Sequence, residues 1–309
     1  MIPPPTRSCY TEPVRRLIVN ADDFGMTTGI NRAIVEGCER GIITSSTLMA
    51  NSGAFDDAVV RAHELRTLKP QFSVGCHVVL LDGEPVLPEE RVRTLLQPSP
   101  GDGNVPLRTS LAHFARAAIT SKLKPEEIEA EGDAQIERIQ SAGIAVSHFD
   151  THKHAHMFPQ VLRPLLRAAR ARGVGAVRNP FGRIFPLPFN GILRNPKLWV
   201  RLAEMNFLRT FAAKFREEVH EHGLRTPDGS VGVLVTGMLE PDYFSSIVEG
   251  LPEGTWEFVC HPGYNDAELD RVRTRLRKSR KEELQVLTSC EAKAALQRRG
   301  VELISYHDL

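Results

Sequence analysis

The stretch Arg16-Leu17-Ile18-Val19-Asn20-Ala21 is a short apolar run of the kind that forms a buried β-strand. It ends in Asp22-Asp23-Phe24-Gly25. Beyond Thr27 and Thr28, two plausible helix N-caps, apolar residues recur at helical spacing as far as Gly41. A buried strand that passes through a polar turn into a helix is the repeating unit of parallel α/β proteins.

The same alternation continues towards the C-terminus. Further strands are predicted at residues 42–49, 71–81, 144–150, 175–178, 231–235, 256–261 and 301–306. Further helices are predicted at 54–65, 107–140, 161–172, 197–222 and 290–299, and the Gly-, Pro- and Asp-rich residues 82–104 are predicted to form a loop. Strands that alternate with helices favour a parallel α/β sheet or barrel.

The chain has 309 residues and shows no internal repeat and no clear linker. We expect a single α/β domain, since barrels of this class often exceed about 200 residues. Residues 1–15 are predicted to be a disordered or extended tail, and residues 16–309 a single catalytic domain with an irregular insertion at 181–229. Within that insertion, the aromatic-rich residues 181–222 are expected to shape a substrate entrance or an oligomer contact.

Composition excludes several classes of partner. The net charge is +1, so no overall field favours nucleic acid, and the basic run at residues 271–281 is interpreted as a solvated helix face. No apolar run approaches the length that spans a bilayer, which predicts no membrane insertion. The five cysteines are scattered and form no CxxC pair, and the N-terminus lacks the apolar core of a signal peptide, so we expect a cytoplasmic protein.

Polar side chains gather at the ends of the predicted strands. Four groups lie at or just beyond the end of an apolar run: Asp22 with Asp23, His77, His148 with Asp150 and His152, and His261. In parallel α/β architectures the carboxyl ends of the strands point the same way and form the ligand site. Groups far apart in the sequence are therefore expected to meet in space.

Each group also has a simpler interpretation when it is taken alone. The adjacent carboxylates of Asp22 and Asp23 repel one another unless a cation or a proton lies between them, but a turn or a helix N-cap also accounts for them. His77, inside an apolar strand, has the alternative of a buried core histidine. His261 before Pro262-Gly263 suits either a rigid turn or a general acid.

The segment His152-Lys153-His154-Ala155-His156 is the strongest single signal. Its histidines alternate, so all three share one face if the segment is extended, and such density suits metal binding. A polar surface loop is the alternative. His152 lies nearest the strand end, so His154 and His156 are expected to support it or to contact substrate.

One aspartate with two histidines forms a mixed oxygen–nitrogen ligand set. Such a set leaves coordination positions open, as catalytic metal sites do. We expect one divalent ion, Mg²⁺ or Zn²⁺, with Mn²⁺ or Co²⁺ as alternatives, and two imidazoles favour a transition metal. An ion of this kind lowers the pKa of bound water and polarises a carbonyl group.

At these residues the chain resembles the YdjC-like carbohydrate deacetylases, which include chitooligosaccharide deacetylases and hopanoid-biosynthesis-associated deacetylases. The resemblance runs from about Arg16 to the C-terminus. The matching stretches, in the family's order and spacing, are Leu17–Gly25, Gly41–Thr47, Gly75–His77, Ser147–Pro159, Glu257–Pro262 and Tyr306–Leu309.

The resemblance implies a barrel-like (β/α) fold related to polysaccharide deacetylases and often dimeric. It implies that Asp23, His77 and His152 bind the metal ion, that Asp22 is the catalytic base and that His261 is the catalytic acid. The remaining candidates, as substrate contacts or supports of the ligands, are Asp150, His154, His156 and Arg178. Arg178 is expected to orient Asp22 or a sugar hydroxyl, with a surface ion pair as the alternative.

These observations together predict a metal-dependent hydrolase that removes the acetyl group from an N-acetylated sugar, an N-acetylglucosamine-type oligosaccharide or glycolipid. The predicted form is a homodimer. One alternative is another metal-dependent amidohydrolase or a phosphoesterase, although the latter usually needs more carboxylates. The other is a sugar-binding protein without activity, which the presence of both proton-transfer candidates disfavours.

Overall fold

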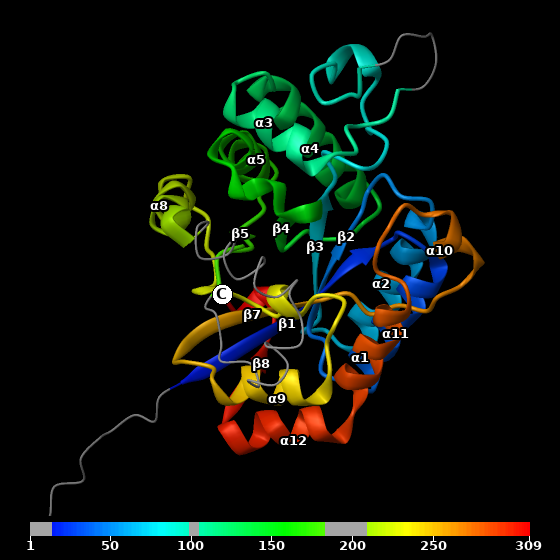
Figure 1. Ribbon diagram of the computed structural model, residues 1–309, viewed down its shortest axis with the longest axis vertical. Coiled ribbons are helices and arrows are strands. Elements are labelled where there is room, and N and C mark those ends of the chain that lie inside the picture. Colours follow the sequence, from blue (N-terminus) through cyan, green and yellow to red (C-terminus); the bar gives the residue numbers. More distant parts are fainter. Residues whose placement is uncertain (1–13, 99–104, 183–208) are drawn as a thin grey trace, which may run out of the picture.

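The computed structural model describes residues 14–98, 105–182 and 209–309 (Figure 1). The described strands, in chain order, are β1 (Arg15–Phe24), β2 (Ser45–Leu48), β3 (Ser73–Val78), β4 (His148–Thr151), β5 (Ala176–Val177), β6 (Gly229–Val231), β7 (Gly254–Cys260) and β8 (Val301–Ile304). The α-helices are α1 (Thr28–Glu39), α2 (Phe55–Leu68), α3 (Leu111–Ile119), α4 (Pro125–Ser141), α5 (Pro159–Ala171), α8 (Ala212–Glu221), α9 (Pro241–Glu249), α10 (Ala267–Arg271), α11 (Lys278–Thr288) and α12 (Cys290–Arg299).

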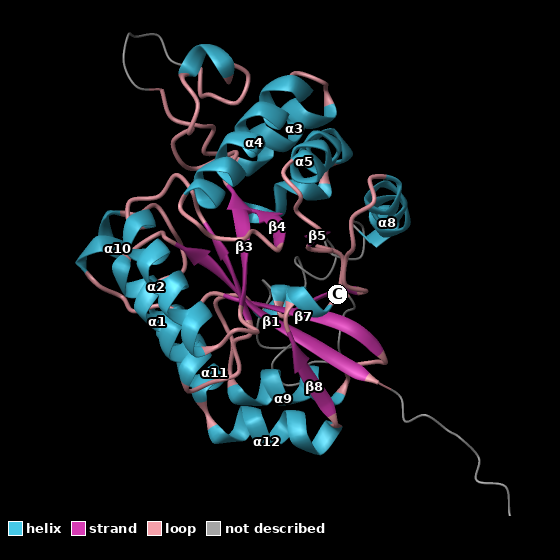
Figure 2. Cartoon of the chain, turned by 180° about the vertical axis from the view of Figure 1, so that it is seen from behind, coloured by secondary structure: helices cyan, strands magenta, loops and turns pink. Residues whose placement is uncertain are grey.

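The strands form one parallel sheet in the order β5-β4-β3-β2-β1-β7-β6, and β8 pairs with the first part of β1. The sheet curls into an incomplete barrel with the helices around its outer side (Figures 1 and 2). A single parallel bridge, Ala176 with Arg225, links β5 to the segment that leads into β6. The predicted single-domain α/β barrel-like fold is therefore confirmed.

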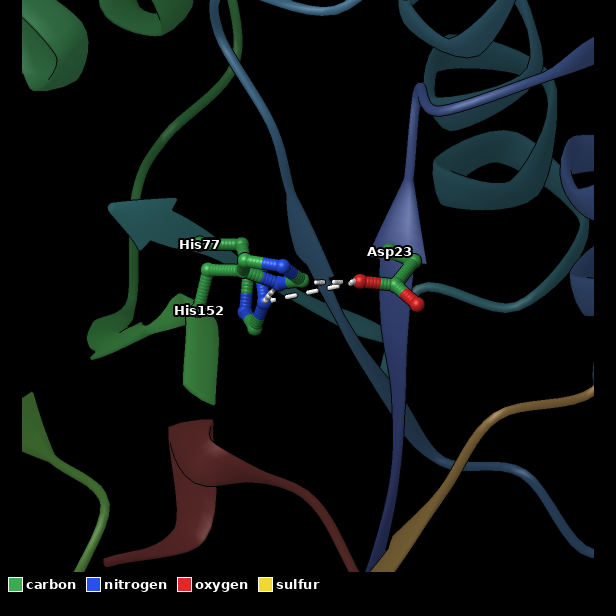
Figure 3. Close-up of side chains that lie close together, drawn as sticks. All are labelled: Asp23, His77 and His152. Atoms are coloured by element: carbon green, nitrogen blue, oxygen red, sulfur yellow. Dashed lines mark hydrogen bonds and ion pairs between the residues drawn. The ribbon is translucent and has the colours of Figure 1, made fainter. Parts of the chain in front are cut away.

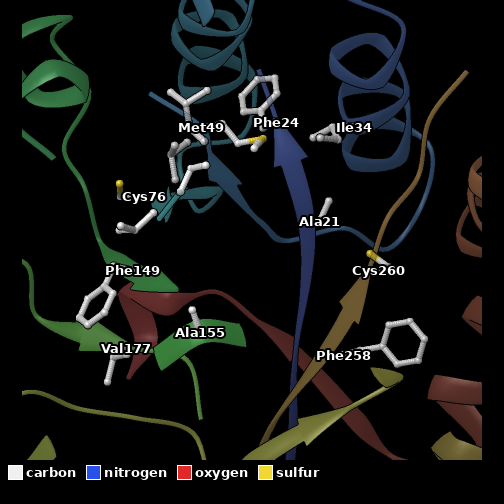
Figure 4. Packing of buried hydrophobic residues seen from close by; sticks show 14 of the residues in the cluster. Ala21, Phe24, Ile34, Met49, Cys76, Phe149, Ala155, Val177, Phe258 and Cys260 are labelled. Atoms are coloured by element: carbon white, nitrogen blue, oxygen red, sulfur yellow. The ribbon is translucent and has the colours of Figure 1, made fainter. Parts of the chain in front are cut away.

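β1 occupies the centre of the sheet because its sequence suits burial on both faces. Leu17, Ile18 and Val19 are almost completely buried, as expected of a strand inside a parallel sheet. The chain then turns into α1, where the Thr27 side chain accepts a hydrogen bond from the Ile30 N–H and caps the helix. The core continues on either side of this strand (Figure 4).

Two predicted elements differ from the structure. The helix predicted at 107–140 is two helices, because Ser121 has a φ of +53° and Pro125 begins α4. The strand predicted at 231–235 stops at Val231, because Gly232 takes a φ of +88° and a 3₁₀ turn follows at Val233–Val235.

Glu131 on α4 is fully buried, although it is a carboxylate on a helix that covers the sheet. Its carboxylate accepts hydrogen bonds from the backbone N–H groups of Val86 (2.8 Å) and Leu87 (3.0 Å). A periodic pattern identifies this carboxylate as polar but cannot show that a loop folds over it.

Two predictions fall partly outside the described residues. Of the predicted tail, residues 1–13 lie outside them, and β1 already begins at Arg15. Of the predicted insertion, residues 183–208 lie outside them, whereas α8 forms part of the helix predicted at 197–222. In the described part of the chain, no helix has the length and hydropathy that a membrane span requires.

Candidate metal and catalytic site

The predicted site residues meet at the carboxyl edge of the sheet. Asp22 and Asp23 lie near the end of β1, and His77 lies near the end of β3. Asp150 lies in β4, and the remaining residues directly follow their strands: His152 after β4, Arg178 after β5 and His261 after β7. Parallel strands deliver residues to this edge wherever they stand in the sequence.

Asp23, His77 and His152 form the tightest group (Figure 3). Asp23 Oδ1 lies 3.6 Å from His77 Nε2 and 3.6 Å from His152 Nδ1. The two ring nitrogens lie 3.4 Å apart. Three donor atoms on three different strands or strand ends thus face a common point.

The donor set fits a divalent metal ion. Ligands at about 2.0–2.2 Å from a tetrahedral ion stand about 3.3–3.6 Å from one another, which matches the spacing of these three atoms. A second group, Asp22, His77 and Asp150, also has its donor atoms close together. Arg178 already forms ion pairs with both of those carboxylates, so the second group suits a cation less well.

The Asp23 carboxylate is held from two sides. Its backbone has a φ of +67°, a conformation that costs a residue other than glycine roughly 1–3 kcal/mol and that concentrates at functional sites. Its second oxygen, Oδ2, accepts a hydrogen bond from Arg280 Nη2 at 2.6 Å. Burial raises the pKa of Asp23, but the Arg280 charge together with the neighbouring His152 and His261 holds that pKa well below its usual range. Asp23 therefore presents an ionised carboxylate to the two histidines.

His77 is oriented by the carboxylate behind it. Its Nδ1 lies 2.7 Å from Asp150 Oδ1, which leaves Nε2 facing Asp23 and His152. Burial lowers the pKa of His77, but Asp150, followed by Asp22 and Asp23, raises it to about 9. A carboxylate on the far nitrogen of a ligand histidine fixes the ring and raises its basicity. The Thr47 hydroxyl lies 3.2 Å from both His77 Nδ1 and Asp150 Oδ2 and completes this support.

Arg178 lies under the site and is fully buried. It donates to Asp22 at 2.8 and 2.6 Å and to Glu257 at 2.9 Å, and it forms a further ion pair with Asp150. Burial raises the pKa of Asp22, but Arg178 lowers it well below its usual range. Arg178 is thus a buried partner of Asp22, and the alternative of a surface ion pair is wrong.

His261 faces the second oxygen of Asp22. Its Nε2 lies 3.7 Å from Asp22 Oδ2, and its backbone N–H donates to Glu283 at 2.6 Å. Its other ring nitrogen, Nδ1, is buried without a hydrogen-bond partner among the described residues. Asp22 and His261 thus stand together beside the three-residue group.

The segment His152–His156 is not extended, so the condition for a shared face of its three histidines is not met. Residues 152–157 form a 3₁₀ turn in which Lys153 and His154 have φ values of +56° and +53°, so the rings do not share one face. His156 lies 2.7 Å from the Thr151 hydroxyl and 3.2 Å from the Arg178 carbonyl and supports the chain below the site. Burial, followed by Arg178, lowers the pKa of His154 to about 3, so this ring is neutral.

Sequence reasoning missed several supporting residues: Asn20, Thr47, Glu257, Arg280 and Tyr306. Glu257 carried a usable signal, since it is a carboxylate inside the apolar run of β7. Arg280 carried no such signal in the sequence. It belongs to the basic run interpreted as a solvated helix face, yet it is only 1% exposed.

The curled parallel sheet and its Asp–His edge define a (β/α) barrel protein with a candidate divalent-metal site. The chain belongs to the YdjC-like protein family, which matches residues 16–298. Carbohydrate deacetylases from Brevibacillus brevis and Geobacillus stearothermophilus are each 31% identical over 295 residues, which is 95% of this chain and 99% and 98% of theirs. The predicted family resemblance is confirmed.

A solved structure agrees with the fold. An Enterococcus faecalis V583 protein, described as a candidate cellobiose-phosphate cleavage protein, matches with a TM-score of 0.74 and 25% identity. The match covers 96% of this chain and 98% of that protein. The barrel is thus shared across almost the whole length of both chains.

Proposed function

We propose that this protein is a metal-dependent deacetylase that hydrolyses the acetamide of an N-acetylated sugar. The observation that carries the proposal is the triangle of Asp23, His77 and His152 beside the pair Asp22 and His261. The carbohydrate deacetylases that align with 95% of this chain support the substrate class.

Asp23, His77 and His152 would hold one divalent ion, Mg²⁺ or Zn²⁺, or alternatively Mn²⁺ or Co²⁺. When bound, such an ion polarises the acetamide carbonyl and makes water a stronger nucleophile. The chain contributes the orientation of the donors: Asp150 fixes the His77 ring at 2.7 Å, and Arg280 fixes the Asp23 carboxylate at 2.6 Å.

Asp22 would act as the general base. Arg178 and the Asn20 side chain, whose Nδ2 lies 2.9 Å from Asp22 Oδ1, hold the carboxylate ionised and in one orientation. It takes a proton from the attacking water as the new C–O bond forms. His261 would donate a proton to the amine nitrogen as the C–N bond breaks, releasing acetate and the free amino sugar.

A phosphoesterase is less well supported. Two-metal phosphoesterases need a second cation about 3.5–4 Å from the first. The carboxylates available for it, Asp22 and Asp150, are paired with Arg178. An inactive sugar-binding protein would not need an ionised base beside a histidine.

The direct test is acetate release from N-acetylglucosamine oligomers by the purified protein. The protein is stripped with a chelator and then assayed with each of the four candidate metals. We expect no release without metal and recovery with at least one ion. Failure of every metal to support release from the oligomers and from N-acetylated glycolipids would overturn the proposal.

We further propose a cytoplasmic homodimer. Cys38, Cys76 and Cys260 are buried and unpaired, which supports a reducing compartment. The dimer rests on resemblance to the family. Light scattering coupled to size exclusion tests it, and a mass near 34 kDa would contradict it.

A further inference from the structure

The two carboxylate oxygens of Asp23 have different neighbours. Oδ1 points towards His77 and His152, at 3.6 Å from each ring nitrogen (Figure 3). Oδ2 receives the Arg280 guanidinium at 2.6 Å. A carboxylate can bind a metal ion through one oxygen or through both, and here the second oxygen is already engaged.

Arg280 cannot easily leave this position. Its Nε donates to the Leu276 carbonyl at 3.1 Å, and its own carbonyl accepts from the Gly263 N–H at 3.1 Å. A Cβ at Gly263 would stand 2.9 Å from Arg280 Cδ, so the loop packs directly on the arginine stem. Asp23 is the carboxylate with which Arg280 forms an ion pair in the described part of the chain.

A guanidinium in this place has two effects on a metal ligand. It occupies the lone pairs of Oδ2, and its fixed charge opposes a divalent ion on that side of the carboxylate. A metal ion can then bind Asp23 through Oδ1 alone. Single-oxygen ligation keeps more coordination positions open, which catalytic sites require and closed structural sites do not.

We propose that Arg280 is a positioning residue that restricts Asp23 to single-oxygen metal ligation. This inference rests on the proposed function, because it takes Asp23, His77 and His152 as the ligands. The arginine thereby lowers the affinity for the metal ion and keeps coordination positions open. Without it, Asp23 closes on the ion with both oxygens, and the ion binds more tightly but leaves less room for water and the acetamide oxygen.

The test uses Arg280→Met, which keeps most of the unbranched stem of the side chain and removes its charge, and Arg280→Lys, which keeps the charge. Both full-length proteins are titrated with Co²⁺, whose visible absorption weakens as the number of ligands rises. We expect Arg280→Met to bind Co²⁺ about tenfold more tightly, since a nearby like charge is gone, and to show a weaker absorption per bound ion. Arg280→Lys should keep both values close to the wild type.

An unchanged absorption, or weaker binding, in Arg280→Met would overturn the inference. If Arg280→Met does not fold, Arg280→Gln takes its place with the same expected results. His77→Ala separates this outcome from failure of the proposed function. If wild type and His77→Ala bind Co²⁺ equally, the ligand set itself is wrong. If His77→Ala loses Co²⁺ binding but the Arg280 variants do not show the expected affinity and absorption, the ligand set is correct and the proposed role of the arginine is wrong.

Discussion

Asp22 and Asp23 are adjacent in sequence but point into different environments. Asp23 turns towards the two histidines, whereas Asp22 is held by Arg178 and faces His261. The left-handed backbone at Asp23 lets both neighbouring side chains reach the same site, because consecutive residues of a regular strand would point to opposite faces of the sheet. In the proposed mechanism, one strand end would therefore provide both a metal ligand and a base.

Replacing Asp22 by Asn should separate the two roles. Asn keeps the shape of the side chain but cannot take a proton, so we expect metal content to stay native and turnover to fall roughly a hundred- to ten-thousand-fold. Metal analysis and acetate release on the same sample check this. Asp242→Asn, on the exposed side of α9, is the control. Turnover near the native rate would show that Asp22 is structural.

Replacing His77 or His152 by Ala should remove the metal ion while the fold persists. Each ring supplies one donor atom to the triangle, and a missing donor leaves only two ligands. Elemental analysis after desalting measures the loss, and circular dichroism checks the fold. His113→Ala on the surface of α3 should retain full metal content. Native metal content in both ligand variants would contradict the assignment.

At the scale of elements, strand ends were predictable and helix breaks were not. Apolar runs located β1, β3, β4 and β7, and parallel pairing then required their ends to meet. The left-handed residues Lys153 and His154 were not predictable, because their conformation depends on contacts such as the 2.5 Å ion pair of Lys153 with Asp82. The burial of Arg280 was unpredictable for the same reason, because its partner, Asp23, lies near the other end of the chain.

The C-terminal 3₁₀ turn, Tyr306–Asp308, supports the site from below. The Tyr306 ring stacks on His148 at 3.5 Å between centroids, and its hydroxyl donates to Glu257 Oε2 at 2.8 Å. Glu257 in turn binds Arg178. The last residues of the chain are thus connected to the base through two buried groups.

Tyr306→Phe should keep the stacking and lose the hydrogen bond. Because Glu257 is buried and then lacks one donor, we expect a loss of about 1–3 kcal/mol in the free energy of unfolding. Urea denaturation measures it, with Tyr243→Phe on α9 as the matched control. A variant as stable as the wild type would show that this hydroxyl contributes nothing net.

At the scale of the whole molecule, the candidate ligands join three parts of the sheet. Asp23 comes from β1, His77 from β3 and His152 from the segment after β4. A metal ion that binds the folded chain alone therefore stabilises the entire barrel. The class of fold followed from the alternation of elements, but the isolated Ala176–Arg225 bridge did not, because isolated pairs leave no periodic pattern.

Removing the metal ion should lower the melting temperature without unfolding the protein at room temperature. At a free metal concentration of about 100 times Kd, binding contributes about 2.7 kcal/mol, which corresponds to about 4–5 °C in Tm for a domain of this size. Thermal melts with and without chelator check this. His152→Ala should show no such difference, and an equal shift in that variant would place the ion elsewhere.

The pairing of β1 has a consequence for how the protein is made. β1 is the first described strand to leave the ribosome, yet it pairs with β7 and β8, which are synthesised last. β2 can pair with part of β1 early, but the rest of the β1 pairing must wait for nearly the whole chain, and long-range pairing of this kind forms slowly. We therefore expect the nascent chain to depend on chaperones until its final strand emerges.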